Sequence, residues 1–197
     1  MGLTNLPAVA AFALAAAITP GPNNVLVMAS GANFGFRRTI PHVLGTSIGI
    51  AMMIILIGIG LTIVYDLLPV LHTGLKLVAF AYLLFLAWKI ANTAPPESGS
   101  SNSRPFTLVQ AAAFQWVNPK VWAMGLSVVT LYAPERSFLS VALIAMIFAL
   151  VGIPANSLWA GTGTVLRKWL SNGKQIRMFN VAMAILLVAS LYPIIMR

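Results

Sequence analysis

A lysine within an apolar stretch is the residue whose chemistry fits its surroundings least. Lys120 lies near the centre of residues 106–132, directly after Asn118 and Pro119. A charge in a membrane interior costs roughly 2.5–3.5 kcal/mol on insertion scales, so such residues are functional by default. Two interpretations stay open. Lys120 pairs with the carboxylate of a bound substrate, or its aliphatic stem reaches along the helix to a polar cavity.

A second chemical feature interrupts the first apolar stretch, residues 6–32, with the sequence TPGPNN at 19–24. Two prolines within one helical turn remove two backbone donors. Inside a membrane, irregular backbone survives only where protein or a water-filled cavity covers it. Pro119 follows Pro20 by 99 residues (119 − 20), about half of the 197-residue chain. Paired interruptions in two halves of a transporter indicate its central binding site.

The residue types at both interruptions favour binding of an anion. Thr19 and Asn118 are predicted N-caps, each followed by a proline at the first helical position. The free N–H groups and positive dipole of such half-helices attract an anionic group such as an amino acid carboxylate. The alternative is a pair of proline kinks whose carbonyls are covered by neighbouring side chains.

Amide side chains near the interruptions add hydrogen-bonding capacity for a substrate. Asn156 in the fifth apolar stretch could complete the cavity, or could form only an interhelical hydrogen bond. His42 is a candidate for proton-linked transport, because histidine titrates near neutral pH, or it lies simply at the interface. The candidate substrate-binding residues are Thr19, Pro20, Gly21, Pro22, Asn23, Asn24, Gln115, Asn118, Pro119, Lys120 and Asn156.

Six apolar helices are required to position these residues. The chain is 59% hydrophobic and 8% charged, which excludes a soluble globular domain, where charged residues make up about a quarter. A membrane span needs about 20 apolar residues. The spans are predicted at 6–32, 39–65, 69–91, 106–132, 138–162 and 176–196.

A polar linker at 92–104 divides the chain into halves of three spans each, 1–91 and 105–197. An odd number of spans forces the halves into opposite orientations. We therefore expect an all-α integral membrane protein, a single transporter domain over 1–197, built as two inverted three-helix repeats. Spans one and four are expected to break near the midplane. The GxxxG motif at Gly45 favours packing within the bundle, and a homodimer stays open.

The charge pattern predicts the orientation. The net charge is +9, and eight of the twelve basic residues fall in loops one, three and five. These loops are expected in the cytoplasm, with both termini outside, in a bacterial inner membrane. The same pattern argues against nucleic acid as a partner. With no cysteine and no metal-ligand spacing between His42 and His72, no metal, cofactor or enzymatic activity is expected.

Several of these motifs resemble the LysE/RhtB exporters. They are TPGPNN at 19–24, GFRR at 35–38, the glycines of span two, AWK at 87–89 and QWVNPK at 115–120. The resemblance covers essentially the whole chain. Within the family, residues 82–91 look most similar to exporters of cysteine and O-acetylserine.

The resemblance implies efflux of a small neutral amino acid or derivative, driven by proton antiport with alternating access. One departure concerns span two, where many members carry an acidic residue and this chain has Ile50-Ala51-Met52-Met53. A carboxylate proton carrier at this point is therefore in doubt. The alternative function is a passive pore or channel for small polar solutes, which the sequence alone does not separate from a transporter.

Overall fold

The computed structural model describes residues 6–61, 69–93, 104–135, 137–170 and 172–190, and these form helices and no strand. Most of the predicted linker, residues 94–103, and both termini lie outside the described residues. In chain order the helices are α1 (Leu6–Ile18), α2 (Pro22–Phe34), α3 (Phe36–Leu56), the π-helix η2 (Ile57–Leu61), α5 (Pro69–Ala91), α6 (Leu108–Phe114), the 3-10 helix η4 (Gln115–Val117), α7 (Pro119–Tyr132), α8 (Phe138–Trp169) and α9 (Gly173–Ala189).

Helices occupy each of the six predicted ranges, and the first and fourth ranges are each divided. Among the described residues, Phe36–Gly60 and Phe138–Trp169 are each long and apolar enough to cross a membrane. The pair α1 and α2, bent by 59° at its break, counts as a third span if it is one element. The helix α8 runs on to Trp169, beyond the predicted end at 162.

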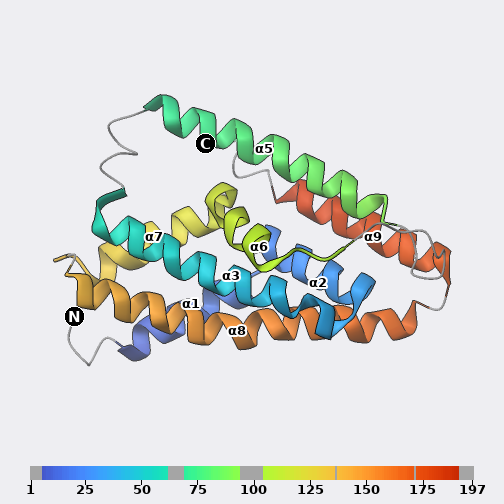
Figure 1. The fold of residues 1–197 in the computed structure, drawn as a ribbon, viewed down its shortest axis with the longest axis horizontal. Helices are drawn as coiled ribbons and strands as arrows, with labels where there is room; N and C mark the ends of the chain where they lie inside the picture. The colour runs from blue at the N-terminus through green and yellow to red at the C-terminus, as the bar shows by residue number, and fades with distance from the viewer. Residues whose placement is uncertain (1–5, 62–68, 94–103, 136, 171, 191–197) are drawn as a thin grey trace.

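The helices lie roughly along the long axis of the molecule (Figure 1). The long helices α3 and α8 pack against each other, and α2 lies against α8. The helices α5 and α9 pack side by side along the opposite edge of the view in Figure 1. The short helix α6 lies against α3, and α1 lies against α8. This packing places both interruptions within the bundle.

Glycines allow the closest helix contacts. A Cβ at Gly45 would lie 2.2 Å from the Leu108 carbonyl oxygen, and a Cβ at Gly163 would lie 2.0 Å from that of Met28. No real Cβ atom tolerates such distances, so these helices meet backbone to backbone. The prediction that the motif at Gly45 serves internal packing is confirmed. Gly161 lies in the same helix as Gly163 but makes no such contact, because a Cβ at this position would have nothing within 4 Å.

Two large clusters of buried apolar side chains form most of the core, and a small third cluster of Val27, Val43 and Ala160 joins α2, α3 and α8. The first joins α1, α3, α7 and α8 and contains Val9, Ala13, Met53, Ile54, Ile57, Val121, Val128, Val129, Ala133, Val141, Ile144, Ala145 and Phe148. The second joins α2, α5, α6 and α9 and contains Val25, Leu26, Ala29, Leu83, Leu86, Ala87, Phe114, Met183, Ala184 and Leu187. Many large apolar side chains also point outward, such as Leu158 and Leu150, and these fit a lipid-facing surface.

Candidate functional site

The first interruption is built differently from its prediction. Thr19 does not cap α2, because its hydroxyl donates a 2.6 Å hydrogen bond back to the carbonyl of Ala15 and so closes α1. The N-cap of α2 is Gly21, whose backbone is extended, and Pro22 stands in the first turn. No side chain caps α2. The N-terminus of α2 therefore keeps backbone donors that no side chain in its own cap satisfies.

The second interruption follows its prediction. Asn118 is the N-cap of α7, and its side-chain oxygen accepts a 3.2 Å hydrogen bond from the backbone N–H of Lys120. Pro119 occupies the first helical position, where its missing donor costs nothing. The Asn118 amide donates in turn to Gln115 Oε1 at 3.2 Å, and Gln115 Nε2 donates to the carbonyl of Ala111 at 2.8 Å. Gln115 is fully buried and orients Asn118.

Lys120 connects the two interruptions. Its ammonium donates a hydrogen bond to the carbonyl of Thr19. A Cβ placed on Gly21 would lie 2.9 Å from the Lys120 side chain at Cδ, so the glycine leaves room for the lysine stem. The side chain lines a cavity of about 440 Å³ between the two broken helices. Both earlier interpretations of Lys120 stay compatible with this position, since it reaches a polar cavity in which a ligand could lie.

Four buried polar side chains from three helices form a network beside the cavity. Asn23 of α2 donates to Asn156 Oδ1 of α8 at 3.1 Å, and Thr46 of α3 donates to Asn23 Oδ1 at 2.9 Å. Asn156 Nδ2 donates to the hydroxyl of Ser47 at 3.4 Å. Asn23 and Asn156 also line the cavity, so the same amides that join the helices face its interior.

The carbonyls exposed by the first break have side-chain donors. Asn24 Nδ2 donates to the carbonyls of Ala17 and Thr19 at 2.9 and 3.0 Å. The indole N–H of Trp159 donates to the same Ala17 carbonyl at 3.2 Å. These bonds satisfy the broken backbone without extended secondary structure, as buried irregular backbone requires.

Five of the predicted site residues meet at this cavity, and six do not line it. The lining residues are Asn23, Asn24, Asn118, Lys120 and Asn156. The others, which shape the backbone or support the lining from behind, are Thr19, Pro20, Gly21, Pro22, Gln115 and Pro119. The remaining wall is apolar, with alanines of α1 together with Ile50, Met124 and Phe148.

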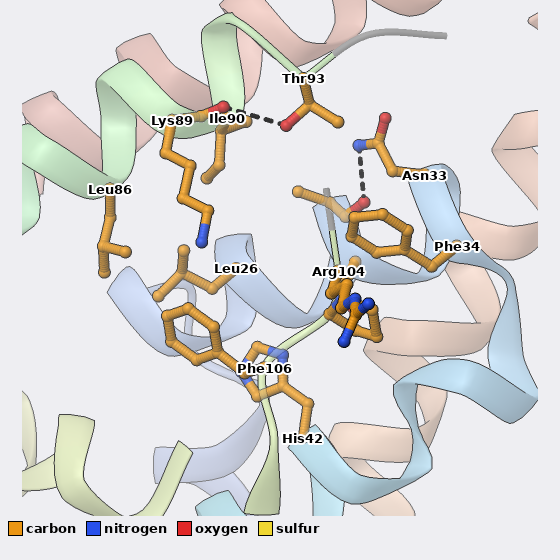
Figure 2. A pocket seen from close by; sticks show the side chains of 13 residues that line it. Leu26, Asn33, Phe34, His42, Leu86, Lys89, Ile90, Thr93, Arg104 and Phe106 are labelled. Carbon is orange, nitrogen blue, oxygen red and sulfur yellow. Dashed lines mark hydrogen bonds between the residues drawn. The ribbon is translucent and has the colours of Figure 1, made fainter. Parts of the chain in front are cut away.

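His42 lies elsewhere. It lines a second pocket, of about 470 Å³, between α2, the end of α5 and the start of α3 (Figure 2). The two pockets share no lining residue. The described residues contain no group of three or more His, Cys, Asp or Glu side chains that could hold a metal ion.

The sequence did not indicate the buried polar pairs, of which Ser30 with Thr39 is one and Asn33 with Asn180 is another. Asn33 of α2 and Asn180 of α9 donate to each other's side-chain oxygens at 2.7 and 3.0 Å. Asn180 also donates to the carbonyl of Thr93 at 3.3 Å. An asparagine flanked by apolar residues in a helix is the available signal, since a buried amide needs a partner. Nothing near either residue in the sequence indicates which partner it has.

A polar cavity between two broken helices, within a bundle whose outer surface is apolar, is typical of membrane transport proteins. The family model described as LysE type translocator matches residues 14–190, and the chain belongs to this family of multi-pass membrane transporters. No solved structure matches the chain.

Curated relatives cover nearly the whole chain. A protein of Escherichia coli strain K12, named cysteine/O-acetylserine efflux protein, is 31% identical over 189 residues, which are 94% of each chain. Proteins with the same name from Escherichia coli O1:K1 and from Shigella sonnei strain Ss046 show the same identity and coverage.

Proposed function

We propose that this protein exports a small amino acid or amino acid derivative, of the cysteine or O-acetylserine kind, across the bacterial cytoplasmic membrane. The observation that carries the proposal is the cavity in which Lys120 meets the amides of Asn23, Asn24 and Asn156. The names of the relatives support the substrate class.

The carboxylate of the substrate is assigned to Lys120 and the start of α2. A ligand carboxylate at this position replaces the Thr19 carbonyl as the acceptor of the Lys120 ammonium. The bond from the ammonium to a carboxylate is stronger than the bond to the carbonyl, because both partners are charged. The N-cap of α2 is Gly21, and no side chain caps this helix. The positive end of the α2 dipole therefore also attracts the carboxylate. Asn23 and Asn156 then lie within the cavity for the amino group, and the apolar wall receives the side chain.

The start of α7 is a weaker anion site than the sequence suggested. Asn118 already accepts from the Lys120 N–H through its side chain and from Val121 N through its carbonyl at 3.0 Å. The backbone N–H groups of Lys120 and Val121 therefore already have acceptors. The proposed carboxylate site is asymmetric, with the N-terminus of α2 on one side and the lysine side chain from α7 on the other.

Alternating access is proposed as movement between two inverted three-helix halves. The packing supports this arrangement, because α1 lies against α8 as α6 lies against α3, and α5 lies against α9. Exchanging the halves exchanges these contacts. The bonds from Lys120 to Thr19 and from Asn23 to Asn156 cross between the halves and would break as one half rocks against the other. The six spans, the midplane breaks, the cytoplasmic basic loops and the external termini belong to the same proposal.

The test is transport into inside-out membrane vesicles. Labelled cysteine, O-acetylserine, threonine and leucine are offered with and without a proton gradient. We expect saturable uptake of cysteine or O-acetylserine that collapses with the gradient. Non-saturable, gradient-independent uptake would instead identify the passive pore. Vesicles with Lys120→Met should lose uptake, while vesicles with Lys168→Met, at the exposed end of α8, should retain it.

A further inference from the structure

The second pocket contains the one buried side chain of the described residues whose polar atoms have no hydrogen-bond partner. His42 is 2% exposed, and neither ring nitrogen is bonded. Its ring lies 5.0 Å from that of Phe106, centroid to centroid. Neighbouring polar groups are satisfied, since Ser30 and Thr39 share a 3.0 Å hydrogen bond. Buried polar groups are rarely left unpaired, so the nitrogens of His42 indicate a ligand of the pocket.

Two cations complete the pocket. Lys89 comes from the last turn of α5, and Arg104 comes from the segment that leads into α6. Figure 2 shows the Lys89 side chain pointing from α5 towards Leu26, with Arg104 and His42 on the far side of the space. No carboxylate is among the described lining residues. The charges therefore select an anion, and an arginine side chain matches a carboxylate geometrically.

Most of the remaining lining is apolar, including Leu26, Leu86, Ile90 and Phe106. Its other polar members are Ser30, Asn33 and Thr93. A ligand that fits this environment has a carboxylate, a short apolar or weakly polar body, and a group that bonds to imidazole. A neutral imidazole offers one donor and one acceptor. An amino acid zwitterion supplies an ammonium to the acceptor and a carboxylate to the donor.

The pocket lies in series with the central cavity. Asn23 of α2 lines the cavity and Asn33 lines the pocket, and ten residues of helix correspond to about 15 Å. On α3, His42 precedes Thr46 by one turn, and Thr46 donates to Asn23. The same two helices thus carry the lining of both spaces.

We propose that this pocket is a second binding site for an amino acid carboxylate, at which substrate is loaded before it reaches Lys120. Lys89 and Arg104 bind the carboxylate, and His42 binds the amino acid through its ring nitrogens. The inference rests on the proposed function for the substrate class. It places the loading site on the side of the basic loops, to which Lys89 and Arg104 belong.

Equilibrium binding tests the inference without depending on transport. Purified protein is titrated with labelled cysteine under reducing conditions. We expect two equivalents bound per chain for the wild type, one for Lys120→Met, and one for the double variant Lys89→Gln/Arg104→Gln. Both residues of the double variant are exposed, so the fold should persist. Arg37→Gln/Lys168→Gln removes the same charge from exposed positions outside the pocket and should still bind two.

Transport supplies the second readout. In inside-out vesicles the Lys89→Gln/Arg104→Gln variant should raise KM about tenfold with an unchanged maximal rate, because charge-assisted bonds at the loading site are lost. His42→Phe should act in the same direction. One equivalent bound by the wild type, or an unchanged KM, would overturn the loading site. An anionic lipid that copurifies with the wild type and is lost from the double variant would overturn it too. Absence of wild-type transport with two equivalents bound would refute the proposed export and leave the second site standing.

Discussion

The ammonium of Lys120 donates a hydrogen bond to the carbonyl of Thr19, 101 residues away in the chain. The break between α1 and α2 exposes the Thr19 carbonyl, and the break before α7 carries the Lys120 ammonium that binds it. The contact joins the break between α1 and α2 to the start of α7. It also satisfies a charge that would otherwise be costly within a membrane. Under the proposed function, a substrate carboxylate replaces the Thr19 carbonyl as the acceptor at this ammonium.

Replacing Lys120 by methionine should abolish export while keeping the fold. Methionine retains the length of the aliphatic stem and removes the charge. Loss of a hydrogen-bonded charge partner costs about 2–5 kcal/mol, which corresponds to a fall in transport efficiency of roughly 30-fold to 4,000-fold. Uptake into vesicles at matched expression measures the effect. Wild-type uptake by Lys120→Met would show that the lysine only occupies the cavity and does not bind the substrate.

The bond between Asn23 and Asn156 should couple α2 to α8. A double-mutant cycle with Asn23→Ala and Asn156→Ala measures this coupling by unfolding in micelles. Hydrogen bonds between membrane helices average about 0.6 kcal/mol and reach about 1.7. We expect a value in the upper part of that range, because Thr46 donates to the oxygen of the Asn23 amide whose nitrogen donates to Asn156, and the chain of bonds strengthens the network. Additive effects of the two substitutions would contradict an interaction between them.

Acid stability should report on Glu135, in the turn before α8. The Ser140 hydroxyl donates a 2.7 Å hydrogen bond to the carboxylate, which is the largest of several interactions that together lower the Glu135 pKa from its usual 4.5 to about 2. A lowered folded-state pKa stabilises the fold above pH 4.5, and this contribution disappears as the pH falls towards 2. The melting temperature of the wild type should therefore fall more steeply over this interval than that of Glu135→Gln.

The chain makes this comparison unusually simple. It has three acidic side chains, and the other two, Asp66 and Glu97, are the same in both proteins. The difference between the two melting profiles therefore isolates Glu135. Because the side chain is exposed, the effect should be small. Parallel profiles from pH 2 to 4.5 would mean that the interactions which lower the Glu135 pKa, the bond from Ser140 first among them, do not hold in solution.

The comparison of Asn118 with Thr19 shows what the sequence could reveal. Asn118 caps the helix that follows it, because an asparagine before a proline has a local acceptor for the next N–H. Thr19 has the same choice but bonds backwards to Ala15, since Gly21 adopts the extended backbone that starts α2 two residues later. The residue types therefore predicted where the first helix breaks. They did not predict whether the Thr19 hydroxyl would bond forward to cap α2 or backward to the Ala15 carbonyl.

Partners distant in sequence could not be predicted in this way. Asn33 and Asn180 are 147 residues apart, and apolar residues flank each of them along its own helix. The pockets show the same limit. His42 and Asn23 are both buried polar residues, but they line different pockets. His42 lies one turn before Thr46 on α3, and it is Thr46 that reaches Asn23 beside the central cavity. Which helix faces which pocket depends on packing that single-residue chemistry does not encode.

Three glycine-to-alanine substitutions should separate folding from transport. At Gly163 a Cβ would lie 2.0 Å from the backbone oxygen of Met28, so α2 and α8 must separate. Such overpacking costs about 1–3 kcal/mol. At Gly21 the nearest atom is Lys120 Cδ at 2.9 Å, on a flexible side chain, and the backbone is extended, as any residue allows. Gly163→Ala should therefore lower the melting temperature, while Gly21→Ala should keep it and reduce uptake by displacing Lys120.

Gly161→Ala is the matched control, in the same helix as Gly163. Nothing lies within 4 Å of its Cβ, and alanine favours a helix interior over glycine by about 1 kcal/mol. It should leave uptake unchanged and raise the melting temperature slightly. Equal loss of stability at Gly161 and Gly163 would contradict the close contact of α2 with α8. Full uptake by Gly21→Ala would show that transport does not require Lys120 to reach Thr19, because the added methyl group blocks the path of its side chain.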